Sequence, residues 1–308
     1  MGMRKIFLIK TLLALCIMTG AQTPMHRLLG EPGSSTYLLD EFPGASVAYS
    51  VRKLSSSYTG YCLKARRGGD NAELDFGFVN GFLDTAAMKS WGGSNVVGII
   101  WYDQSGNGRN ATNTTGGQNP DLIAGSTLIR IGSLAAIDFG QLASDARFMQ
   151  LPTGFLNGTT TLSYFQAGNM SDIPNGGIFG PSTTNSVGLE VLQVNTISRP
   201  TMLRMNGTNR NDNAGAAYRL WDNITNTITT ILGNSTDVNC YKNGSAVTLT
   251  SSAAMPALNY NGIYGLGQYN SATEEGKATL QEFIIWETDQ TSNRTGIEAH
   301  INAYFSYF

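Results

Sequence analysis

The chain has 308 residues, of which only 14% are charged, and its formal net charge is −2. This charge provides no basic surface for nucleic acid, so no nucleic-acid partner is expected. With only two histidines, the sequence offers little support for a His-based metal site or a Ser-His-Asp catalytic triad. Gly is abundant, at 36, and Pro is scarce, at 9, which is typical of many short strands joined by tight turns.

Residues 1–21 have the layout of a secretory signal peptide. Basic residues precede an apolar run at 11–20, and Thr19-Gly20-Ala21 offers small residues for cleavage. The run is too short to span a membrane, and no later segment is expected to do so. We expect a secreted or cell-surface protein. The alternative is an amphipathic arm on an intracellular or virion protein.

The rest of the chain is expected to be a linker at 22–36, rich in Gly, Pro and Ser, and one domain at 37–308. No internal repeat or second linker interrupts that domain. Cys62 and Cys240 follow the signal peptide. They are expected as two separate buried thiols or, in an oxidising compartment, as one disulfide.

Short apolar runs, several of them alternating with polar residues, recur along the domain, as expected of half-buried strands. The expected strands are 45–51, 61–65, 96–102, 127–131, 135–139, 161–167, 187–194, 201–205, 225–232, 236–242, 263–267 and 279–287. Two helices are expected, at 84–91 and 292–305. The pattern predicts an all-β sandwich with one or two short helices.

One hairpin is well marked by its turn. Asn243-Gly244 separates two strand-like runs, and this pair favours a type I′ turn because both residues tolerate positive φ. The stretch Tyr241-Lys242-Asn243-Gly244 resembles a hairpin of laminin-G-like and concanavalin-A-like sandwiches.

The first half of the domain carries a longer series of motifs. They are AYSVRKL at 48–54, YTG at 58–60, RRGGDN at 66–71, DTA at 84–86 and WYDQSGNG at 101–108. The series resembles the catalytic domain of the α-L-arabinofuranosidase B family, glycoside hydrolase family 54. It also looks like domains in phage and bacterial surface proteins.

The resemblance implies a concanavalin-A-like jelly-roll β-sandwich over residues 37–308. The family's chemistry is retaining hydrolysis of terminal arabinofuranose, which needs two carboxylates about 5 Å apart. At the position of the family's nucleophile this chain has Asn206, and at that of its acid/base it has Tyr269. Gly176-Gly177 replaces the family's vicinal cysteine pair. These departures predict that the family's catalytic groups are missing.

Other carboxylates are candidates for catalysis. Glu190 and Glu282 lie in expected strands, and a strand Glu facing a concave sheet is suited to glycoside hydrolysis. The favoured interpretation is that both are solvated residues pointing outward. Asp103 lies in the best-matched motif, where a structural turn is favoured over ligand contact.

Aromatic and polar side chains suggest a ligand surface. Trp221, with Tyr218 and Arg219 beside it, is the best candidate for stacking on a sugar, and Asn206 and Tyr269 are further candidates for ligand contact. Two other tryptophans, at 101 and 286, are expected in the core.

A cluster of charged residues is expected early in the domain. We expect it to form a salt-bridge network at the rim of the domain, made by Arg66, Arg67 and Asp70. No metal site and no cofactor are expected. Calcium binding is compatible with the fold class, at no identified site.

The leading hypothesis is a secreted or surface-exposed module that binds carbohydrate or decorates a larger assembly. One alternative is a retaining glycoside hydrolase that pairs Glu190 with Glu282 or Asp103. Another is a virion or cell-surface structural protein that assembles with other surface proteins and binds no sugar.

Overall fold

The computed structural model describes residues 37–113, 117–140, 147–170, 176–182, 184, 186–193, 201–211, 226–249, 251–269, 271–275 and 278–308. The predicted signal peptide and linker lie outside these residues.

The described chain contains many short strands and three helices. The helices are α1 (Leu38–Glu41), α2 (Thr85–Gly92) and α3 (Arg294–Phe305). The strands are β1 (Val47–Ser50), β2 (Leu63–Arg67), β3 (Glu73–Phe76), β4 (Phe78–Val79), β5 (Phe82–Leu83), β6 (Val96–Trp101), β7 (Ala111–Thr112), β8 (Asp121–Ala124), β9 (Thr127–Leu128), β10 (Arg130–Ile131), β11 (Leu134–Ala135), β12 (Ile137–Asp138), β13 (Met149–Gln150), β14 (Leu162–Met170), β15 (Gly176–Pro181), β16 (Leu189–Gln193), β17 (Thr201–Met205), β18 (Thr208–Asn211), β19 (Thr227–Gly233), β20 (Val238–Lys242), β21 (Ser245–Val247), β22 (Tyr264–Leu266), β23 (Gln268–Tyr269), β24 (Ser271–Glu275) and β25 (Ala278–Trp286).

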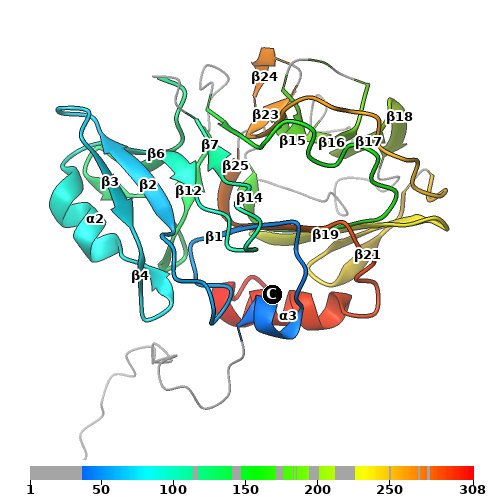
Figure 1. The fold of residues 1–308 in the computed structure, drawn as a ribbon, viewed down its shortest axis with the longest axis horizontal. Coiled ribbons are helices and arrows are strands. Elements are labelled where there is room, and N and C mark those ends of the chain that lie inside the picture. Colours follow the sequence, from blue (N-terminus) through cyan, green and yellow to red (C-terminus); the bar gives the residue numbers. More distant parts are fainter. Residues whose placement is uncertain are drawn as a thin grey trace, which may run out of the picture. The chain divides into compact units, whose positions relative to one another are not determined.

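The strands form two antiparallel layers. The first sheet runs β1–β25–β14–β19–β20–β21, with β12 beside the first residues of β25. The second sheet runs β3–β2–β6–β7–β13–β22–β15–β16–β17–β18. Strand β8 pairs with both β6 and β12 and so joins the layers at one side. Figure 1 shows β14, β19 and β25 of the first sheet and β15, β16 and β17 of the second. The predicted all-β jelly-roll sandwich is confirmed.

Aromatic side chains fill the space between the two sheets. Phe283 on β25 lies 5.1 Å from Tyr164 and 5.2 Å from Phe179, measured between ring centroids. Phe179 stacks on Tyr264 at 4.9 Å, and these two residues belong to the second sheet. All four rings are fully buried. Such contacts between large rings add to the hydrophobic gain of burying them.

Local sequence signals account for several elements. Asn243 and Gly244 have φ values of 48° and 77°, so the predicted hairpin turn between β20 and β21 is confirmed. Both predicted helices form, and the Asp84 side chain caps α2 by accepting the N–H of Ala87 at 2.9 Å. The four-residue α1 was not expected, because its length is too short to show a helical period.

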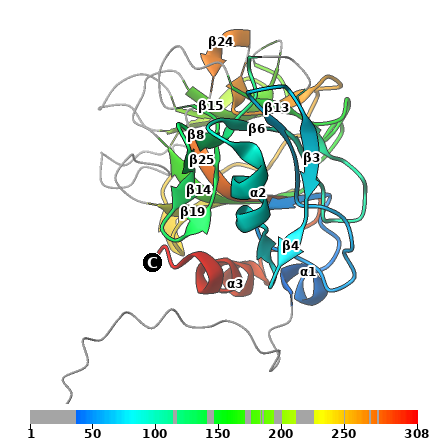
Figure 2. The same cartoon turned by 90° about the vertical axis from the view of Figure 1, so that its left-hand side faces the viewer.

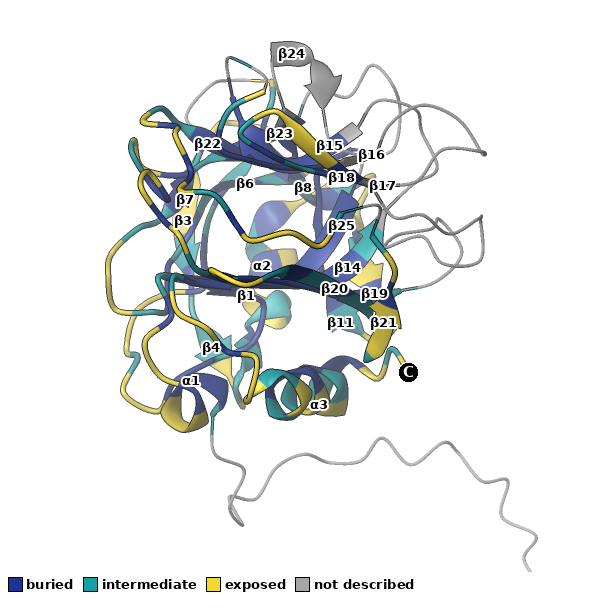
Figure 3. Cartoon of the chain, turned by 90° about the vertical axis from the view of Figure 1, so that its right-hand side faces the viewer, coloured by how far each residue is buried: buried dark blue, intermediate teal, exposed yellow. Residues whose placement is uncertain are grey.

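A buried ion pair lies on the outer face of the first sheet, beneath α3. Arg52 donates from Nε and Nη2 to the two oxygens of Glu282 at 2.7 and 2.8 Å, and Ser50 Oγ donates at 2.7 Å. The guanidinium carbon of Arg52 lies 4.1 Å from the ring centre of Tyr304 on α3. The expectation that Glu282 is solvated was therefore wrong, since a helix covers the face that strand alternation assigns to solvent (Figure 3).

We expect Arg52→Met to lower the free energy of unfolding by about 3–5 kcal/mol, because it leaves the charge of Glu282 buried without its partner. As a control, Lys64→Met removes an exposed 3.6 Å contact with Glu73 and should cost less than about 1 kcal/mol. Urea unfolding of both variants measures the difference. Equal losses would contradict the importance of the buried pair.

Candidate functional site

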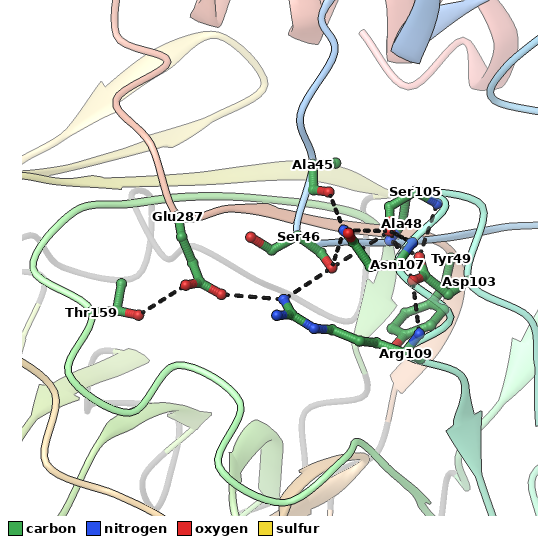
Figure 4. Close-up of polar contacts among 10 residues, drawn as sticks. All are labelled: Ala45, Ser46, Ala48, Tyr49, Asp103, Ser105, Asn107, Arg109, Thr159 and Glu287. Atoms are coloured by element: carbon green, nitrogen blue, oxygen red, sulfur yellow. Dashed lines mark hydrogen bonds and ion pairs between the residues drawn. The ribbon is translucent and has the colours of Figure 1, made fainter.

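Asp103 organises the loop between β6 and β7 (Figure 4). Its Oδ1 accepts the backbone N–H groups of Ala48 and Ser105, both at 2.9 Å. Its Oδ2 accepts the Ser105 hydroxyl at 2.8 Å and the N–H of Arg109 at 3.0 Å. Four donors from the chain itself thus occupy this buried carboxylate, and the interpretation of Asp103 as part of a structural turn is confirmed.

The same loop ties the start of β1 to the end of β25. Asn107 Nδ2 donates to the carbonyls of Ala45 at 2.9 Å and Ser46 at 3.1 Å. Arg109 Nη1 donates to Ser46 at 3.3 Å and lies 3.4 Å from the carboxylate of Glu287 (Figure 4). The loop that contains the WYDQSGNG motif therefore holds the start of β1 close to the end of β25.

We expect Asp103→Asn to destabilise the protein by roughly 2–3 kcal/mol, because an amide NH₂ would face donors that now bind a charged oxygen. Asp84→Asn is the matched control, since Asn caps a helix about as well as Asp and should change stability by less than about 0.5 kcal/mol. Thermal or urea unfolding compares the two. A small, equal effect at both positions would argue against the role given to Asp103.

Glu190 is buried on β16, directly opposite Arg204 on β17. Its Oε1 accepts the N–H of Ser186 at 2.5 Å, and its Oε2 lies 2.9 Å from Arg204 Nη1. Burial raises the pKa of the carboxyl group, against the lowering effects of Arg204 and of backbone N–H groups. The expectation of a solvated Glu190 was wrong, because the side chain folds back onto its own loop and onto the neighbouring strand.

The three candidate carboxylates contact separate parts of the fold. Glu282 lies beneath α3, Glu190 lies on the β16–β17 pair, and Asp103 holds the β6–β7 loop. Glycoside hydrolysis requires two carboxyl groups facing each other across the sugar, about 5–10 Å apart. Among the described contacts, none joins any two of these groups. A catalytic role for them stays a prediction.

The pKa of Glu190 predicts a measurable pH effect. A raised pKa means that the folded state binds the proton more tightly than the unfolded state, so stability falls as pH rises. The fall should begin near the usual value of 4.5 and end above the raised pKa. The unfolding free energy of the wild type, minus that of Glu190→Gln, should therefore decrease over this window. Urea unfolding at a series of pH values measures it, and parallel curves would contradict it.

The family-matched position Asn206 lies in the turn between β17 and β18, with φ of 47°. Its Nδ2 donates to the carbonyl of Ala257 at 2.7 Å, and its Oδ1 accepts the N–H of Asn259 at 3.0 Å. The side chain therefore fastens this hairpin to the segment that leads into β22. With both ends of the amide engaged, ligand contact by Asn206 stays a prediction.

The other family-matched positions lie on two strands. Gly176 and Gly177 are on β15. Tyr269 is on β23, just after Gly267, whose φ of 72° turns the chain. The predicted ligand residues at 218, 219 and 221, which are Tyr218, Arg219 and Trp221, lie outside the described residues. Their role stays a prediction.

A hollow of about 230 Å³ lies at the edge of the second sheet, where β2, β6 and β8 run side by side. We call it the arginine hollow. Its lining includes Arg66, Arg67, Asn95, Asn119, Asp121 and Arg147.

Strand register builds this hollow from distant parts of the sequence. Arg66 on β2 lies opposite Val97 on β6, which lies opposite Asp121 on β8, and Asp121 lies opposite Asp138 on β12. Residues directly opposite each other share one face of a sheet. Arg147 reaches this row from before β13, with Nη1 2.6 Å from Asp121 and 3.7 Å from Asp138. It thus lies between two like charges that would otherwise repel.

Each arginine of the hollow has an acidic partner. Arg67 donates from Nε and Nη2 to Asp70, both at 2.7 Å, which confirms the predicted rim salt bridge between these two residues. This contact lowers the pKa of Asp70 to about 2. Arg66 pairs instead with Glu73 at 3.2 Å. The lining of the hollow is therefore polar, and each of its three arginines is paired with an acidic side chain.

Such a lining can bind a hydroxyl-rich ligand. Guanidinium and amide groups donate hydrogen bonds, while carboxylate and amide oxygens accept them, and a sugar hydroxyl needs both kinds of partner.

Among the described residues, no group of three or more His, Cys, Asp or Glu side chains is placed to hold a metal ion. No helix in the described part of the chain is long and apolar enough to cross a membrane.

Sequence reasoning found Arg66 and Arg67 but missed Asn119, Asp121 and Arg147. The strand β8 was not expected, because it has only four residues and follows a proline. Asp121 is separated by 55 residues from Arg66, and only the pairing of β2, β6 and β8 brings them together. No local pattern signals such a contact.

The two described cysteines lie on different layers. Cys62 precedes β2 and Cys240 lies on β20. Both thiols are buried, and no disulfide joins them. Burial raises the pKa of Cys62 far above its usual value, so this thiol is poorly reactive.

Comparison with known proteins gives matches at the level of structure. The sequence matches no family model. It also matches no curated protein. A GH54 α-L-arabinofuranosidase soaked with a cyclic sulfate inhibitor matches with a TM-score of 0.63 and 15% identity, over 84% of this chain and 62% of that chain.

A second solved structure, an arabinofuranosidase complexed with arabinofuranosyl-α-1,2-xylobiose, matches with a TM-score of 0.61 and 16% identity over the same shares. The chain thus spans less than two thirds of the length of these enzymes. At this identity the likeness is one of fold: the chain has the β-sandwich fold seen in GH54 arabinofuranosidases.

Proposed function

We propose that this chain is a carbohydrate-binding module and that the arginine hollow is its binding site. The observation that carries the proposal is the lining of this hollow of about 230 Å³, where basic, acidic and amide side chains lie next to one another. This mixture suits a ligand that carries many hydroxyl groups and no dense charge.

Donors remain for a ligand after the internal ion pairs are counted. The described contacts of Arg147 use Nη1, and those of Arg66 use Nε and Nη2. Among the described residues, the Nε and Nη2 of Arg147 and the Nη1 of Arg66 have no hydrogen-bond partner. The acidic side chains hold both guanidinium groups in place, so a ligand would meet donors that are already oriented.

The candidate carboxylates are occupied by contacts within the chain, and this favours binding over hydrolysis. Glu282 and Asp103 are saturated by partners from the chain itself, and Glu190 is enclosed by Arg204 and its own loop. We also propose that residues 1–21 direct the chain to the cell surface or the exterior. A structural role on a virion or cell surface is the alternative.

The proposal predicts binding on an array of neutral and acidic glycans by the full chain. Arg147→Gln and Arg66→Gln should each weaken binding by roughly 10- to 100-fold, because each removes charge-assisted hydrogen bonds. Arg130→Gln, which changes an exposed arginine outside the hollow, is the matched control and should bind as the wild type does. No binding to any glycan would favour the structural alternative.

Turnover of 4-nitrophenyl α-L-arabinofuranoside is the companion measurement. The unmodified chain is expected to release no nitrophenol, whatever an Asn206→Glu variant does. Release by the unmodified chain would show that it is an enzyme and would overturn a purely binding function.

A further inference from the structure

A pair of tyrosines lies at the opposite end of the same sheet region from the arginine hollow. Tyr61 precedes β2 and is 52% exposed, one of few large apolar side chains so exposed in the described part of the chain. Tyr102 follows β6, and the two ring centroids are 6.2 Å apart. The Tyr58 hydroxyl donates to the carbonyl of Tyr61 at 2.8 Å, which fixes the exposed residue's backbone.

Polar side chains connect this pair to the hollow. Lys64 lies opposite Asp75, and Arg66 lies opposite Glu73, so all four share one face of β2 and β3. The Tyr102 hydroxyl donates to Asp75 Oδ1 at 2.7 Å. Residues two apart on a strand are separated by about 7 Å. The tyrosine pair and the arginine hollow are therefore neighbours along a continuous strip.

The other face of these strands packs against α2, although Leu74 on β3, opposite Ala65, is 42% exposed. Phe76 on β3 is buried and lies 5.4 Å from Trp91 on α2, measured between ring centroids. Leu63 and Ala65 on β2 are buried on the same side. Figure 2 faces the side of the molecule that carries α2, β3 and β4. The polar strip thus lies on the face of β2 and β3 that is turned away from α2.

Charges along the strip nearly cancel. The basic side chains are Lys64, Arg66, Arg67 and Arg147, and the acidic ones are Asp70, Glu73, Asp75, Asp121 and Asp138. Four positive and five negative charges leave a net charge of −1. A polyanionic ligand would find no net attraction here.

We propose that the ligand of the binding site is a neutral oligosaccharide, with one sugar in the arginine hollow and a further sugar against Tyr61. This inference rests on the proposed carbohydrate-binding function. The exposed ring of Tyr61 offers an apolar surface to the C–H face of a sugar. Lys64 and the Asp75 carboxylate supply polar partners between the two ends. Affinity should therefore depend on chain length.

Isothermal titration with the full chain tests this. The probes are arabino-, xylo-, cello- and manno-oligosaccharides of one to five residues, with oligogalacturonides as the acidic counterparts. We expect one neutral series to bind about three- to tenfold more tightly as trisaccharide or longer than as monosaccharide. Raising the salt concentration from 50 to 500 mM should leave this affinity unchanged.

Variants separate the two ends of the strip. Tyr61→Ala should abolish the gain with chain length, and Tyr61→Phe should keep it, because the ring rather than the hydroxyl faces the sugar. Tyr37→Ala, at the start of α1, is the matched control and should behave as the wild type. Arg147→Gln should weaken binding at every chain length.

The outcomes are distinct. Equal affinity for monosaccharide and oligosaccharide, or an unchanged gain in Tyr61→Ala, would overturn the tyrosine subsite while binding in the hollow stands. Tighter, salt-sensitive binding of oligogalacturonides would overturn the neutral ligand. No binding of any probe, together with a blank glycan array, would overturn the proposed function itself.

Discussion

The buried pair of Arg52 and Glu282 is the interaction on which much of the structure depends. It fixes β1 and β25 in register, because Ser50 lies opposite Glu282 and also donates to it. It also gives α3 a charged surface to pack on through Tyr304. Two residues before Ser50 on the same strand, Ala48 donates its N–H to Asp103, so β1 also contacts the β6–β7 loop. Removing one partner of such a buried pair is costly, because it leaves the other charge uncompensated.

The regular elements were largely predictable because their signals are local. The turn at Asn243-Gly244 follows from two residues, and the helix ending at Phe305 follows from a spacing of three to four residues. The burial of Glu282 and Glu190 was not predictable in this way. Strand alternation predicts that a side chain points away from the core. It does not predict whether a helix or an arginine side chain covers that face of the sheet.

The candidate site depends on contacts that no local pattern encodes. The arginine hollow needs Arg66, Asp121 and Arg147 together, and a register shift in the β2–β6 pairing helps to decide which side chains face it. Conversely, the motif around Asp103 carries the strongest resemblance and serves the architecture. A motif shared with a family can therefore mark a shared scaffold, and the fold alone does not decide the chemistry.

Strand β3 lies at the border of the second sheet, and among the described strands it pairs with β2 alone. Its outer backbone edge would accept a strand from a second molecule, as unpaired edges do in fibres. Glu73 and Asp75 alternate along this edge, so an antiparallel copy would bring like charges face to face. The acidic side chains of β3 thereby also discourage edge-to-edge polymerisation.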